Sequence, residues 1–102
     1  MSTLGQQLSS LIDAQNDLLA AALTIPQRDE IRSRIEDLSE NLEDVVDANW
    51  DETTPDFQKV LGQIDAATAE SEQAKANLAK VDGVLQVVDE VVGAVAKLIG
   101  SL

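Results

Sequence analysis

Residues 55–102, "PDFQKVLGQIDAATAESEQAKANLAKVDGVLQVVDEVVGAVAKLIGSL", carry the longest regular pattern in this sequence. Apolar or small residues recur from Phe57 to Leu102 in steps that alternate between three and four without a slip. This spacing is the a/d seam of a coiled coil or a helical bundle. Because the phase continues through Gly83, the pattern favours one long helix over residues 55–100 rather than a turn at that glycine.

The second half of this seam is broad and rich in β-branched residues, and Val84, Val91 and Leu98 add a third apolar column beside it. A helix with so wide an apolar face has to be covered by another helix or by another copy of the chain. We therefore predict an oligomer seam made of Leu78, Val81, Leu85, Val88, Val92, Val95 and Ile99.

Two shorter helices are predicted ahead of this segment, over residues 3–23 and 25–48. In the first, leucines recur at helical spacing and polar Gln15 fills one of the expected apolar positions. Thr24 and Gln27 have the spacing of a capping box at the start of the second helix. Thr54, with a proline after it, gives the same kind of start signal for the third helix.

These elements predict an all-α protein in a single domain, residues 1–102. In the arrangement that we favour, the first two helices pack antiparallel on the long third helix, and this coiled-coil hairpin self-associates into a homo-oligomer. In the alternative, the chain also turns near Gly83 and forms a compact four-helix up-down bundle.

Composition excludes several classes of function. The chain has no cysteine and no histidine, so thiolate sites and the commonest general base and metal ligand are missing. The net charge of −12 repels phosphate backbones, so we expect no nucleic-acid partner. We expect no enzyme and no cofactor. No signal peptide or membrane span is recognised, which favours a cytoplasmic location, although export without a cleaved signal stays open.

An acidic run on the second helix is the best candidate for a binding surface. It contains Glu36, Glu40, Glu43, Asp44 and Asp47, and no Lys or Arg occurs between residues 36 and 52. The run lies near the helix C-terminus, where the macrodipole disfavours negative charge. The functional interpretation is an acidic docking face for a basic protein partner, and the simpler interpretation is a solvated face that maintains solubility.

The segment between the second and third predicted helices raises two further possibilities. Asp47, Asn49 and Asp51 match the first three ligand positions of a calcium loop, but Glu52 stands where that loop needs glycine and Gln58 where it needs glutamate. We therefore predict an acidic turn rather than a metal site. Trp50 is interpreted as a cap on the core, with a partner anchor as the alternative.

The chain looks like many small acidic all-helical bacterial proteins, a likeness of fold type that does not fix function. We predict a non-catalytic helical module for protein–protein interaction and assembly. One alternative is a membrane-acting protein that uses residues 84–102, which we rank below a buried bundle helix because Asp89 and Glu90 interrupt the segment. The other alternative is an acidic inhibitor or immunity-type protein for a basic target.

Overall fold

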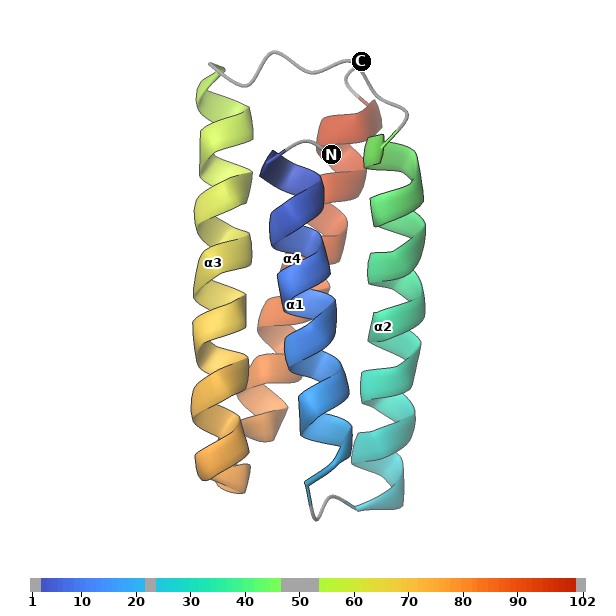
Figure 1. Cartoon of the computed structure of the whole chain (residues 1–102), viewed down its shortest axis with the longest axis vertical. Helices are drawn as coiled ribbons and strands as arrows, with labels where there is room; N and C mark the ends of the chain where they lie inside the picture. The colour runs from blue at the N-terminus through green and yellow to red at the C-terminus, as the bar shows by residue number, and fades with distance from the viewer. Residues whose placement is uncertain (1–2, 22–23, 47–53, 101–102) are drawn as a thin grey trace.

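The computed structural model describes residues 3–21, 24–46 and 54–100, which form four α-helices and a single 3-10 turn. The helices are α1 (Thr3–Leu19), α2 (Ile25–Val46), α3 (Pro55–Ala76) and α4 (Val81–Gly100). They pack into a bundle with principal dimensions of 40 × 20 × 20 Å (Figure 1). The prediction of an all-α helical bundle is confirmed.

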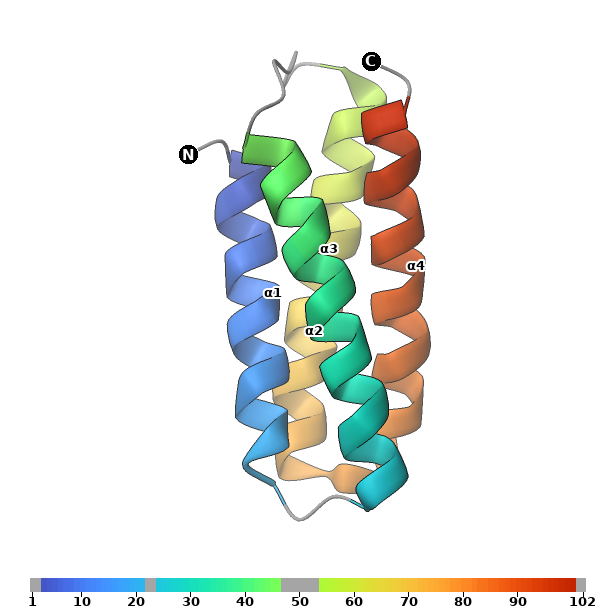
Figure 2. The same ribbon diagram turned by 90° about the vertical axis from the view of Figure 1, so that its right-hand side faces the viewer.

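The helices are arranged as two antiparallel hairpins, α1–α2 and α3–α4, packed side by side (Figure 2). α1 contacts α3 and α2 contacts α4, and the members of each pair run in the same direction (Figure 1). Among the described residues, the backbone of α1 does not approach that of α4 closely, and the backbone of α2 does not approach that of α3. α2 therefore ends, and α3 begins, at diagonally opposite corners of the bundle.

The predicted starts of the second and third helices are confirmed. Thr24 and Gln27 form the reciprocal capping box: the Gln27 Oε1 accepts from the Thr24 backbone N–H at 3.1 Å, and the Thr24 hydroxyl accepts from the Gln27 N–H at 3.3 Å. At α3, the Thr54 hydroxyl accepts from the Phe57 N–H, and Pro55 occupies the first helical turn.

The prediction of one continuous helix over residues 55–100 is wrong, because the chain reverses at Asn77–Lys80. Asn77 is extended, with φ −141° and ψ 92°, and its backbone N–H caps α3 by donating to the carbonyls of Gln73 and Ala74. Its side-chain oxygen then accepts from the Ala79 N–H and starts the 3-10 turn over Leu78–Lys80. The compact four-helix alternative is therefore the one observed, with its turn a few residues before Gly83.

The seam keeps its phase through this reversal for a simple reason. α3 and α4 both face the same core, so each helix has its own apolar stripe. The turn between them is short, and the three-and-four spacing of apolar residues continues from one stripe into the next. Gly83 lies in the first turn of α4, on its exposed side, and no glycine in the described chain has a positive φ.

A single hydrophobic core runs the length of the bundle. α1 contributes leucines at positions 4, 8, 11 and 18, α2 contributes Ile31, Leu38 and Val45, and α3 is anchored by Phe57 and Ile64. α4 contributes valines on a wide face, as its composition requires. Burial of these aliphatic side chains is the main favourable term in folding.

Candidate functional site

Four carboxylates form a continuous exposed strip on α2, which we call the α2 acidic surface: Glu36, Glu40, Glu43 and Asp44. Their spacing places them on one side of the helix, directly opposite the line of Ile31, Leu38 and Val45 that faces the core. The strip extends over about 12 Å of helix. The side of the bundle formed by α2 faces the viewer in Figure 2.

None of these four carboxylates forms an ion pair with a residue that the structure describes. The acidic side chains that do pair with a cation lie elsewhere: Asp17, Asp29, Glu30 and Asp89. Like charges three or four residues apart on a helix destabilise it by about 0.2–0.5 kcal/mol a pair. The α2 acidic surface therefore lowers the stability of the free protein, and a cationic partner would relieve that cost.

Two polar side chains on the inner side of α2 fasten it to α4. The Arg34 guanidinium donates to the Leu85 carbonyl at 2.9 Å and to the Asp89 carboxylate at 2.8 Å, and its side chain is only 14% exposed. The buried Asn41 donates to the Val92 carbonyl at 3.3 Å. Because α2 and α4 run in parallel, Arg34 and Asn41, seven residues apart on α2, reach the carbonyls of Leu85 and Val92, seven residues apart on α4. These bonds hold one side of α2 against α4, so the opposite side, with the acidic surface, faces outward.

The remaining predicted site residues in this region lie outside the described part of the chain. These are Asp47 of the acidic face, the anchor candidate Trp50, and the calcium candidates Asp47, Asn49 and Asp51. Within residues 3–21, 24–46 and 54–100, no group of three or more acidic side chains is placed to hold a metal ion.

The predicted oligomer seam lies against the chain's own helices. Val81, Leu85, Val88 and Val95 are buried in the core, while Leu78, Val92 and Ile99 are half-buried against it. The wide apolar face of α4 is thus covered within one chain, and Ile25 is the one large hydrophobic side chain of the described residues that is exposed. Self-association stays a prediction that a single chain does not test.

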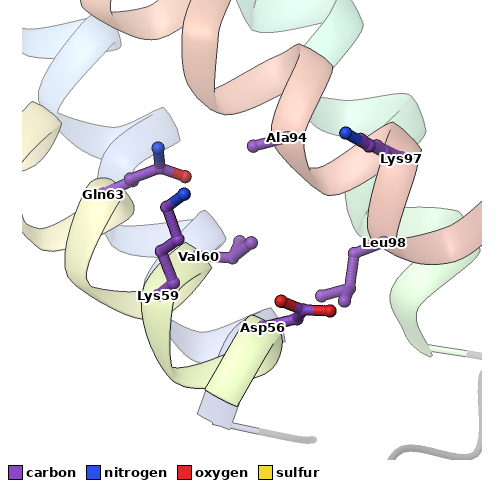
Figure 3. A pocket seen from close by; sticks show the side chains of 7 residues that line it. All are labelled: Asp56, Lys59, Val60, Gln63, Ala94, Lys97 and Leu98. Atoms are coloured by element: carbon purple, nitrogen blue, oxygen red, sulfur yellow. The ribbon is translucent and has the colours of Figure 1, made fainter. Parts of the chain in front are cut away.

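A cleft of about 310 Å³ lies between the start of α3 and the end of α4 (Figure 3). Its apolar surface comes from Val60, Ala94 and Leu98, and two lysines, Lys59 and Lys97, stand on its two walls. Gln63 and Asp56 complete the lining. No motif in the sequence pointed to this cleft, because its two walls lie almost forty residues apart along the chain.

None of the described helices has the length and apolar character needed to cross a membrane. Comparison with protein-family models, with curated proteins and with solved structures finds no match for this chain.

Proposed function

We propose that this protein is a non-catalytic interaction module whose α2 acidic surface docks a basic protein partner. The observation that carries the proposal is the set of four unpaired carboxylates on the outward side of α2. Helix stability alone disfavours this arrangement twice, through repulsion between neighbouring carboxylates and through the position of Glu43 and Asp44 in the last turn of α2. A binding role gives a reason for the arrangement that stability does not.

The surroundings of the surface support a docking role. Arg34 is turned inward to Leu85 and Asp89. Arg32, one helical turn before Glu36, pairs with Asp29 at 3.6 Å. Neither arginine forms an ion pair with the carboxylates of the strip. The attachment of α2 to α4 through Arg34 and Asn41 orients the helix so that the four charges gather on one outward side before a partner arrives. Such a pattern raises the association rate of an oppositely charged partner by one to three orders of magnitude, an effect that salt screens.

The test compares two variants with the same change in net charge. In the surface variant, Glu36, Glu40, Glu43 and Asp44 become their amides. In the control variant, the amide replacements are made at four exposed acidic residues of α3 and α4, namely Glu70, Glu72, Asp82 and Glu90. A basic partner captured from native extract and identified by mass spectrometry is then titrated against all three proteins at low and moderate salt.

We expect the surface variant to lose at least tenfold in association rate while the control variant stays within about twofold of the parent. The salt dependence of binding should be weakened in the surface variant alone. Equal losses in the two variants would show that net charge, rather than the α2 acidic surface, governs association, and the proposal would then fail. The same measurement applies if the partner is a basic enzyme that this chain inhibits.

Self-association is a separate prediction with its own measurement. Because Val81, Leu85, Val88 and Val95 are already buried in the core of one chain, an oligomer built on the whole seam requires helices to be exchanged between copies. Light scattering across a dilution series tests this prediction, and a strict monomer at high concentration would contradict it.

A further inference from the structure

The cationic side chains of this acidic chain are almost all occupied. Of seven Lys and Arg residues, five contact an oxygen acceptor: Arg28, Arg32, Arg34, Lys75 and Lys80. The remaining two, Lys59 and Lys97, make no hydrogen bond or ion pair with the part of the chain that the structure describes. In a chain with 19 Asp and Glu residues, two such unpaired cations are unexpected.

Both unpaired lysines line the same cleft. Lys59 comes from α3 and Lys97 from α4, and their side chains stand on facing walls in Figure 3. Gln63 follows Lys59 by one helical turn of α3, and Figure 3 shows both side chains toward one end of the cleft, whereas Asp56 and Leu98 are toward the other end. Between these polar groups the lining is apolar, from Val60, Ala94 and Leu98.

We propose that this α3–α4 cleft binds small amphipathic carboxylates. The ligand carboxylate lies between the Lys59 and Lys97 ammonium groups and accepts from the Gln63 amide, while its hydrocarbon part covers Val60 and Leu98. Charge-assisted hydrogen bonds of this kind are the stronger ones available to a protein. The volume of about 310 Å³ matches the lower end of the range of small-molecule sites, so the ligand is a short one.

Asp56 restricts the class of ligand further. Its carboxylate repels a second negative group at the far end of the cleft, so a monocarboxylate is accepted and a dicarboxylate is disfavoured. The site is independent of the α2 acidic surface, because α2 contributes no residue to the lining. Failure of one proposal therefore leaves the other standing.

The experiment is a titration of the whole chain with octanoate, followed by two-dimensional NMR of the backbone amides. Octanol serves as the neutral ligand and the eight-carbon dicarboxylate as the doubly charged one. The test variant is Lys59→Gln/Lys97→Gln. The matched control is Lys75→Gln/Lys80→Gln, which removes two exposed lysines outside this cleft with the same change in net charge. Circular dichroism verifies that both variants fold.

We expect saturable shifts at the amides of Val60, Ala94 and Leu98 with octanoate, and weaker ones with octanol or the dicarboxylate. The test variant should bind octanoate roughly tenfold or more weakly, whereas the control variant should bind like the parent. Three outcomes would overturn the proposal: no saturable shift, equal binding of octanol, or equal losses in the two variants.

Discussion

Gln15 and Ser71 form the one polar pair that is completely buried in the described core, and they offer the sharpest test of how the bundle is held together. The Gln15 Nε2 donates to the Ser71 hydroxyl at 2.6 Å, and that hydroxyl donates to the Ala67 carbonyl at 2.7 Å. The other polar atom of the amide, Gln15 Oε1, is buried without a partner. An unsatisfied buried acceptor costs about 1–3 kcal/mol.

The two single replacements should have opposite effects. Ser71→Ala takes away the hydroxyl that accepts from the Gln15 Nε2, so we expect the free energy of unfolding to fall by about 2 kcal/mol. Gln15→Met keeps the length of the side chain, removes the orphaned oxygen and leaves Ser71 bonded to Ala67. We expect this change to raise the free energy of unfolding by about 1 kcal/mol.

The double variant then measures the coupling between the two residues. With Met at position 15, Ser71→Ala breaks only a local bond and should change stability by less than about 0.5 kcal/mol, because alanine favours the helix. The difference between the two effects of Ser71→Ala is a coupling energy of about 2 kcal/mol. Urea unfolding followed by circular dichroism measures it, and the melting temperature of the Ser71→Ala variant should fall by about 8–16 °C. If Gln15→Met lowers stability, or if Ser71→Ala has the same effect in both backgrounds, the reasoning is refuted.

Three further predictions follow from the turn and from α2. Gly83→Ala should raise the free energy of unfolding by about 0.5–1 kcal/mol, because the residue is helical and an added Cβ meets no atom within 4 Å, whereas a loss would place the turn at Gly83 instead. Asn77→Ala should lower the free energy of unfolding by about 1 kcal/mol, because the side-chain cap on the Ala79 N–H is lost while the backbone cap on α3 is kept. Glu40→Lys should raise the free energy of unfolding by about 1 kcal/mol in chemical denaturation, since it turns four repulsive pairs on α2, with Glu36, Asp37, Glu43 and Asp44, into attractive ones. An unchanged stability would show that solvent screens these pairs. In the same assay, Arg34→Met should lower the free energy of unfolding by about 1–2 kcal/mol and Asp89→Asn by less than about 1 kcal/mol, because the arginine is largely buried whereas the carboxylate is exposed. Equal losses would mean that the ion pair, and not the hydrogen bond to the Leu85 carbonyl, holds α2 against α4.

Helix starts were predictable because their signals are local. Thr24 with Gln27, and Thr54 with Pro55, act on backbone groups within one turn, so the sequence contains the whole interaction. The reversal at Asn77 is also local, but within residues 55–102 we considered a turn only at Gly83, and the unbroken seam favoured a continuous helix. The change from the alanine-rich half to the valine-rich half of residues 55–102 marks the same place, since two different helices meet different neighbours there.

The acidic surface could be predicted because one helix carries all of it, and helical spacing alone puts Glu36, Glu40 and Glu43 on one side. The α3–α4 cleft could not, because its position depends on where the chain reverses. Lys59 and Lys97 lie equally far along the chain from Leu78, so an antiparallel turn at that residue brings them opposite each other. A turn at Gly83 would have moved them out of register by more than two helical turns.

The polar contacts between the two hairpins explain why the bundle takes one of two similar arrangements. Apolar stripes on α3 and α4 would also allow α1 to lie beside α4, since hydrophobic contact is not directional. Among the described residues, the polar contacts between the hairpins instead join α1 to α3 or α2 to α4: Gln15 with Ser71, Asp17 with Lys75, Arg34 with Asp89, and Asn41 with Val92. If α1 lay beside α4 and α2 beside α3, these partners would be lost to Gln15, Arg34 and Asn41. Buried polar groups without partners lower the stability of the fold. The same contacts hold α2 against α4, which leaves its four carboxylates on the outside of the bundle, so the residues that select the fold also present the surface that we propose for docking.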